Sequence, residues 1–249
     1  MANWFDPHQL SASERKIAGR ELEEIANEGD FGAYAEVNRT DNFGETLPSH
    51  NLIKVAGRVE VYRQILKRDL AAIADIGCGI GLTACELSKQ FAPAKVHGYE
   101  VSQEAVAYAK RACPDVNFVA GAISPDSDLD IGFDLILAQE FYPFTRTGDF
   151  SVQSDYLEFL AQHLLPGGVA LIVLSERDRH QTLLANLPEL RDWCEERDLV
   201  ATYFKLPFDR IYRTLPVLWM SRLASIPFSL FGYDRLYAVR IEAPWSPGL

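Results

Sequence analysis

The stretch ADIGCGIGLTACEL, residues 74–87, places three glycines within five positions directly after an apolar run. The apolar run predicts a buried strand, and the residues from Leu82 onward have the spacing of a helix. A strand, a glycine turn and a helix in this order bring bare backbone N–H and C=O groups close to a small ligand. The stretch therefore predicts an α/β fold with a nucleotide-type site at the end of this strand.

Short apolar runs alternate with helical segments through the rest of the chain, which is typical of a mostly parallel sheet with helices on both faces. A helix capped by Ser102 and stopped by Pro114 follows the second strand, and a helical region after the fifth strand is interrupted at Pro188. A further helix carries Leu157, Leu160 and Leu164 on one face. The expected strands are 72–76, 96–101, 116–120, 133–138 and 169–175, with two more within 199–208 and 235–243.

The chain of 249 residues is interpreted as one domain with additions. Residues 1–69 predict a helical N-terminal cap that contributes to the substrate site, with one helix from Ser11 and a second from Ser49. Residues 70–180 form the expected cofactor-binding core. Residues 208–235 form an insert in which aromatic side chains alternate with arginines. That insert fits a lid over an anionic or amphiphilic acceptor, a homodimer surface, or a packed pair of helices.

Net charge, cysteine spacing and hydropathy indicate which partners, metals and membrane contacts to expect. The net charge of −11 argues against nucleic acid, because phosphate binding depends on clustered Lys and Arg. The four cysteines show no metal-ligand spacing, so no metal is expected, and they are typical of a reduced, cytoplasmic protein. The most apolar stretch, 214–232, contains Arg222 and two prolines, so no membrane span is predicted.

The glycine turn fits a dinucleotide site poorly. Gly77 and Gly79 match the dinucleotide fingerprint, but Leu82 stands where its third glycine is expected. Asp75 would repel a pyrophosphate, whereas a carboxylate suits a ligand that carries an ammonium and a sulfonium. Glu100, at the end of the second expected strand, can accept hydrogen bonds from both ribose hydroxyls.

The segments ADIGCGIG, VHGYEVS, VNFVAGAI, FDLILAQE and LLPGGVALIVLS occur in an order and spacing that resemble the class I S-adenosylmethionine-dependent methyltransferases. The resemblance covers residues 70–180 and implies a Rossmann-like, seven-stranded sheet whose last strand is antiparallel. It also implies S-adenosyl-L-methionine as cofactor. The chain departs from the family pattern at two positions. Ala122 stands where the family often has an acid that accepts from the adenine amino group, which leaves the backbone, Ser124 or Asp126 as acceptor. Ile80 replaces the small hydroxyl residue that is common inside the glycine loop. The residues that the resemblance places at the cofactor are Asp75, Gly77, Cys78, Gly79 and Gly81 around the methionine moiety, Glu100 at the ribose, Val101, Gly121, Ala122 and Ile123 at the adenine, and Gln139 and Glu140 past the fourth strand.

Methyl transfer to an O or N atom of a small-molecule acceptor is the function expected from this pattern. Alignment and a dry pocket carry most of such a reaction, and a base is needed only when the nucleophile arrives protonated. Glu140, Tyr142 and His50 are the candidate bases, each with an ordinary structural role as its alternative, and His163 is expected on the solvent side. A non-catalytic cofactor-binding or scaffold protein and an NAD(P)-dependent oxidoreductase remain the alternative functions.

Overall fold

Seven strands form a single mixed sheet in the computed structural model, which describes residues 49–175, 182–206 and 236–244. The strand order is β3-β2-β1-β4-β5-β7-β6. Strands β1 to β5 pair in parallel, and β7 runs antiparallel to both of its neighbours, as expected. The bounds are β1 Ala72–Ile76, β2 Lys95–Glu100, β3 Asn117–Ala120, β4 Phe133–Gln139, β5 Leu164–Ser175, β6 Val200–Lys205 and β7 Leu236–Glu242.

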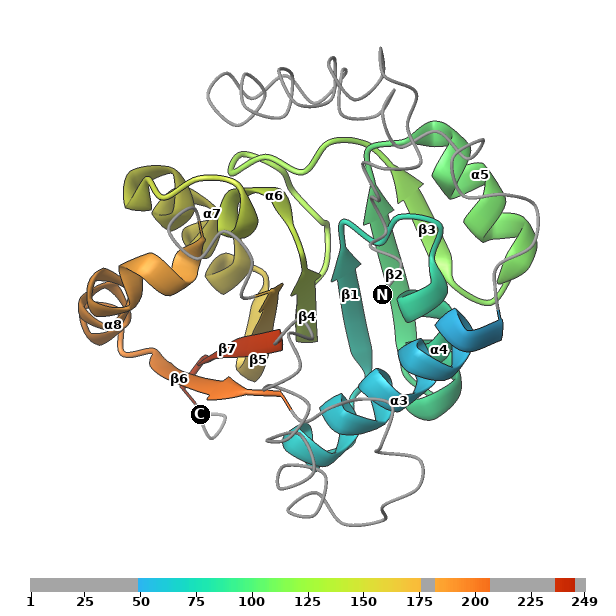
Figure 1. Ribbon diagram of the computed structural model, residues 1–249, viewed down its shortest axis with the longest axis horizontal. Helices are drawn as coiled ribbons and strands as arrows, with labels where there is room; N and C mark the ends of the chain where they lie inside the picture. The colour runs from blue at the N-terminus through green and yellow to red at the C-terminus, as the bar shows by residue number, and fades with distance from the viewer. Residues whose placement is uncertain (1–48, 176–181, 207–235, 245–249) are drawn as a thin grey trace.

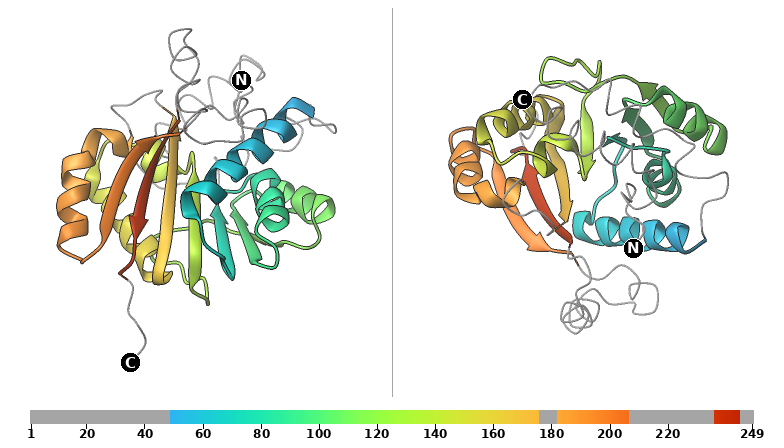
Figure 2. Two further views of the ribbon diagram at one scale, coloured as in Figure 1. Left: turned by 90° about the horizontal axis from the view of Figure 1, so that it is seen from below. Right: turned by 45° about the horizontal axis from the view of Figure 1, so that its top comes forward.

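Helices cover both faces of the sheet (Figures 1 and 2). The first face is covered by α3 (Ser49–Leu66), α4 (Leu82–Gln90) and α5 (Gln103–Ala112). The second face is covered by α6 (Tyr142–Thr145), α7 (Phe150–Gln162) and α8 (Leu187–Glu195), the last preceded by a short 3-10 turn at Leu183–Asn186. The predicted doubly wound, Rossmann-like architecture is therefore confirmed.

Each face of the sheet has its own apolar core, which explains why the sequences of the central strands are continuous apolar runs. Along β4, Leu135 and Leu137 belong to the core under α3 and α4, whereas Ile136 and Ala138 belong to the core under α7 and α8. A strand buried on both faces has no polar alternation. Because β1, β2, β3 and β4 are parallel, their carboxyl ends meet at one edge of the sheet, where this class of fold binds ligands.

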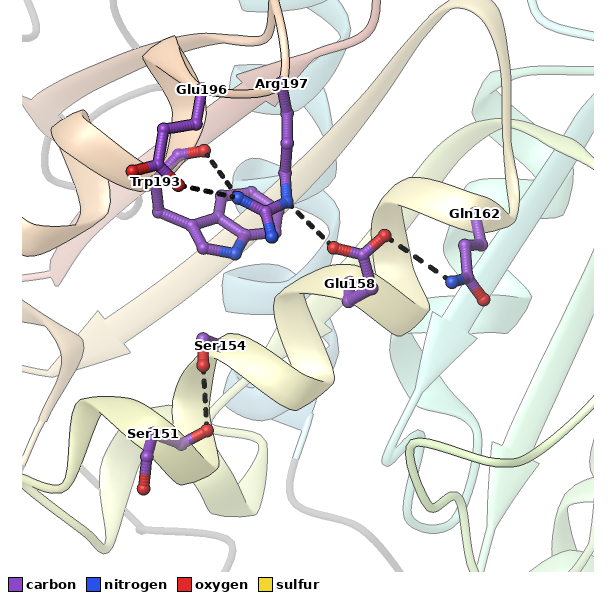
Figure 3. Close-up of polar contacts among 7 residues, drawn as sticks. All are labelled: Ser151, Ser154, Glu158, Gln162, Trp193, Glu196 and Arg197. Carbon is purple, nitrogen blue, oxygen red and sulfur yellow. Dashed lines mark hydrogen bonds and ion pairs between the residues drawn. The ribbon is translucent and has the colours of Figure 1, made fainter.

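An exposed cluster joins α7 to the turn after α8 (Figure 3). The Arg197 guanidinium lies over the Trp193 ring, 4.5 Å from its centroid. Its Nε donates to a carboxylate oxygen of Glu158 over 2.9 Å. Partly exposed pairs of this kind contribute about 0.2–1 kcal/mol each, so the buried apolar side chains carry most of the packing on this face.

Most predicted elements are confirmed, and three details are wrong. Ser102 does cap α5, where its hydroxyl accepts from the Ala105 N–H over 3.2 Å. Leu164 is not helical, because α7 ends at Gln162 and Leu164 begins β5. Pro188 does not interrupt a helix. It lies in the first turn of α8, where a missing N–H costs nothing.

His163 is the third detail, because its ring is largely buried and not on the solvent side. Its Nδ1 lies 2.8 Å from the Phe159 carbonyl oxygen, and its Nε2 accepts from the Leu129 N–H over 3.2 Å. Because Nε2 accepts from Leu129, Nδ1 is the nitrogen that faces the Phe159 carbonyl oxygen as donor. This histidine therefore holds the segment before β4 to the end of α7.

Three predicted features lie outside the described residues: the helix from Ser11, the apolar stretch 214–232 and the insert 208–235. Within the described ranges, no helix has both the length and the hydropathy that crossing a bilayer requires.

Gly98 lies in a closely packed part of the core, and we expect Gly98→Ala to destabilise the protein. A Cβ at this position in β2 would lie 2.6 Å from Phe118 Cδ1 and 3.0 Å from Cys78 Sγ. Overpacking of a filled core costs about 1–3 kcal/mol, which urea denaturation would measure. Gly121→Ala is the matched control, because its Cβ meets nothing within 4 Å, and it should change the unfolding free energy by less than about 0.5 kcal/mol. Equal losses in the two variants would contradict this account.

Candidate functional site

The turn between β1 and α4 depends on three glycines in the left-handed region. Gly77, Gly79 and Gly81 have φ values of +71°, +54° and +80°. The N–H groups of Gly77 and Cys78 both donate to the Tyr99 carbonyl oxygen, over 2.8 and 3.0 Å. A Cβ at Gly81 would lie 2.6 Å from Phe118 Cζ, so packing and backbone conformation both require glycine there. The turn is thereby held against the carboxyl end of β2.

Asp75 is a buried carboxylate beneath this turn, 2% exposed. One of its oxygens accepts from the backbone N–H of Ala84, in the first turn of α4, whose N-cap residue Gly81 has no side chain for this role. The other oxygen, Oδ2, has no hydrogen-bond partner among the described residues. The pKa of Asp75 is raised to about 7, mainly by burial: the Ala84 N–H lowers the pKa in part, and the negative charge of Glu100 contributes to the rise.

Glu100 ends β2 and faces the same turn. Its Oε2 accepts from the Gly79 N–H over 2.9 Å, and its Oε1 accepts from the Ser102 N–H over 3.0 Å. Burial raises the pKa of Glu100, while the N–H groups of Ser102, Gly79 and Val101 oppose that shift. These bonds fix the carboxylate in place, and each oxygen keeps a lone pair for a further donor.

The segment after β3 continues the edge. The Gly121 N–H donates to the Glu100 carbonyl oxygen over 2.9 Å, which places the predicted adenine residues beside the predicted ribose residue. Gly121 and Ala122 are exposed, and Ile123 is half-buried. Space is open around Gly121, where a Cβ would meet no atom within 4 Å.

The end of β4 adds polar and aromatic side chains. Glu140 adopts φ +52°, an uncommon conformation for a residue with a side chain, and its N–H donates to the Val173 carbonyl oxygen over 2.9 Å. This turn lays the Phe141 ring on the glycine turn, with Phe141 Cδ2 3.1 Å from where a Gly77 Cβ would stand. Backbone strain of this kind gathers at functional sites.

The candidate bases differ in setting. Glu140 is exposed at this edge. Tyr142 is partly buried, and burial raises the pKa of its phenol, as it does for the neighbouring Tyr156, whose pKa rises to about 12. Both phenols therefore stay protonated near neutral pH, which makes them hydrogen-bond donors and poor bases. His50 belongs to the first turn of α3, and its side chain lies outside the described residues.

Among the described residues, the cysteines and acids form neither a reactive thiol site nor a metal site. All four cysteines are free, and burial raises the pKa of the Cys78 thiol in the glycine turn, which keeps it an unreactive thiol. Among the residues that the structure describes, no three His, Cys, Asp or Glu side chains gather as metal ligands.

Comparison with known proteins was made at the levels of family, curated sequence and structure. Residues 73–168 match a family model described as a methyltransferase domain. Over these residues the chain is therefore similar to methyltransferase domains. A search of curated protein sequences found no match for the chain.

Solved structures share the fold of this chain. The plantazolicin methyltransferase BpumL, in complex with a pentazolic desmethylPZN analog and S-adenosylhomocysteine, is 20% identical, with a TM-score of 0.58 over 94% of this chain and 100% of that chain. The [4+2]-cyclase SpnF is 16% identical, with a TM-score of 0.51 over 76% of this chain and 81% of that chain. The StiE O-methyltransferase domain is 14% identical, with a TM-score of 0.50 over 75% of this chain and 74% of that chain.

The structure also presents residues that the sequence interpretation did not select. The Tyr62 hydroxyl contacts Gln139. The Phe141 ring lies against the glycine turn. A hydroxyl within an otherwise apolar helical stripe is the signal that could have identified Tyr62.

The raised pKa of Asp75 gives the protein a specific pH dependence. Between pH 4 and pH 7 the folded state keeps a proton that the unfolded chain, with an Asp pKa of about 3.8, has lost, so this group makes stability fall as the pH rises. We expect the stability of Asp75→Asn relative to the natural protein to increase across this range, by at most about 1.4 kcal/mol per pH unit, and to level off above it. Urea denaturation at a series of pH values measures the difference, and a constant difference would rule out the assignment.

Proposed function

We propose that this protein transfers the methyl group of S-adenosylmethionine to an O or N atom of a small-molecule acceptor. The observation that carries the proposal is the unpartnered, buried Oδ2 of Asp75 beneath a glycine turn, inside a region similar to methyltransferase domains. When bound, the cofactor supplies an activated methyl group on a sulfonium. The chain supplies binding, orientation and exclusion of water.

The residues at the carboxyl edge fit that cofactor. Asp75 presents an acceptor to a cationic group, and Glu100 presents two acceptors to the ribose hydroxyls. Gly77, Cys78, Gly79 and Gly81 bring the backbone close to the ligand. Val101, Gly121, Ala122 and Ile123 line the open space expected to receive the adenine, and Gln139 and Glu140 lie past β4.

The same contacts weigh against a nicotinamide dinucleotide. A pyrophosphate binds at free N–H groups of a helix N-terminus, and Asp75 already takes the Ala84 N–H there. A second negative charge, on Glu100, lies beside the turn. Two carboxylates at this position favour a cation.

The acceptor side is aromatic in the part that the structure describes. The rings of Phe141 and Tyr156 meet edge to face, with centroids 5.8 Å apart, and Tyr142 meets Tyr156 in the same manner at 6.4 Å. These side chains suit a small acceptor with apolar surface, and the net charge of −11 disfavours nucleic acid. The named structural relatives include the O-methyltransferase domain of StiE and a methyltransferase crystallised with azole-containing analogues, which supports a small acceptor.

Two further features belong to the proposal. Four free thiols suit the reducing cytoplasm. The insert 208–235 is proposed to contribute to the acceptor site or to a homodimer contact.

The cofactor assignment predicts a measurable affinity that depends on Glu100. Isothermal titration should detect S-adenosylhomocysteine binding, and Glu100→Gln should weaken it at least tenfold, about 1.4 kcal/mol, by losing charge-assisted bonds. Glu195→Gln, at an exposed position on α8, is the matched control and should bind like the natural protein. Absence of binding to the natural protein, or tighter binding of NADH, would overturn the proposed function. An unchanged constant in Glu100→Gln would overturn only the ribose assignment.

Methyl transfer itself requires a separate experiment, because a cyclase shares this fold. Incubation with S-adenosylmethionine labelled in its methyl group, together with fractionated small molecules bearing hydroxyl or amino groups, should yield a labelled product and an equal amount of S-adenosylhomocysteine. Cofactor binding with no labelled product across such fractions would support the non-catalytic alternative.

A further inference from the structure

A tyrosine and a glutamine form a polar pair inside the apolar layer beneath α3. Tyr62 is completely buried on this helix, and its hydroxyl donates to Gln139 Oε1 over 3.1 Å. The two residues are 77 positions apart in the chain. Leu135 and Leu137, on the same face of β4, belong to the surrounding apolar core.

Strand register places this pair at the glycine turn. Leu137 of β4 pairs with Asp75 of β1, and Ala138 pairs with Ile76. Gln139 therefore lies level with Gly77, at the carboxyl edge. Because side chains alternate along a strand, Gln139 and Asp75 point to the same face of the sheet, as their contacts with α3 and α4 require.

The hydrogen bond decides which end of the amide a ligand meets. With Oε1 bonded to the phenol, Nε2 is the end that can donate, and no described residue accepts from it. Asp75 Oδ2, on the same face, is an acceptor without a partner in the described structure. An acceptor and a donor on the same face of neighbouring strands complement the two charged groups of an amino acid. Its ammonium donates hydrogen bonds, and its carboxylate accepts them.

We propose that Tyr62 is a positioning residue that turns the Gln139 amide toward the amino-acid end of the cofactor. The inference rests on the proposed function and assigns α3, which precedes the matched domain, a share in cofactor binding. Packing alone does not require this pair, because replacing both partners of a buried hydrogen bond by apolar groups of similar shape is nearly neutral.

Two ligands separate positioning from a merely structural role. S-adenosylhomocysteine contains the amino-acid end, and 5′-methylthioadenosine has the same adenosine and thioether without it. We expect Tyr62→Phe to raise the dissociation constant of S-adenosylhomocysteine about three- to tenfold, the worth of one hydrogen bond, and to leave that of 5′-methylthioadenosine unchanged. Tyr108→Phe, on α5, is the matched control and should alter neither constant.

A second variant keeps the test decisive if Tyr62→Phe folds poorly. Gln139→Leu should produce the same selective loss, and the double variant should lose no more than Gln139→Leu alone, since Tyr62 acts on the ligand only through Gln139. Equal losses for both ligands would show a structural role and overturn the inference, as would no loss for either ligand in Gln139→Leu. If the natural protein binds neither ligand, the proposed function fails, whereas binding without selectivity overturns only the role of Tyr62.

Discussion

The buried carboxylate of Asp75 is the constraint around which the site is arranged. Removing a charged group from water costs several kcal/mol unless partners compensate, and Asp75 has one backbone N–H where its two oxygens could accept several. The pKa of Asp75 is raised because too few hydrogen-bond donors stabilise the carboxylate, so the protonated, uncharged form is favoured. An apolar residue here would suit the surrounding core better. Retaining the acid therefore makes most sense if a cation completes its solvation, since local conflicts with folding mark functional sites.

The glycine turn lies directly above this buried carboxylate. Three left-handed glycines at alternate positions fold the backbone back on β2, while Phe118 leaves no room for a side chain at Gly81 and Phe141 lies close to Gly77. Glu100 then fixes the turn from the neighbouring strand through the Gly79 N–H. Two acids thus hold one turn, Asp75 from below and Glu100 from the side. Their shared negative potential distinguishes this site from the phosphate-binding turns that have the same strand, turn and helix order.

The sequence predicted the sheet well, together with the glycine turn at its carboxyl edge, because both depend on local patterns. Short apolar runs buried on two faces, a Ser102 cap and closely spaced glycines each report on a few neighbouring residues. The errors occurred where a tertiary partner decided the outcome. Pro188 is a helix start because a 3-10 turn precedes it, and His163 is buried because the Leu129 N–H and the Phe159 carbonyl oxygen occupy its ring nitrogens. The Tyr62–Gln139 contact joins residues on separate elements, and helical periodicity indicates a face without naming what lies opposite.

The turn at the end of β4 directs neighbouring side chains to opposite faces of the sheet. Gln139 points to the face of α3 and α4, where Asp75 also lies, whereas Phe141 packs with Tyr156 on the opposite face. Glu140 stands between them in a strained conformation, so one short turn fixes the direction of both neighbours. Burial raises the pKa of the nearby phenols of Tyr142 and Tyr156, and the Tyr156 hydroxyl donates to the Ile123 carbonyl oxygen over 3.3 Å, so neither phenol is suited to act as a base. The proposed methyl transfer therefore depends mainly on the alignment of donor and acceptor, because an in-line transfer gains more from fixed geometry than from a strong base.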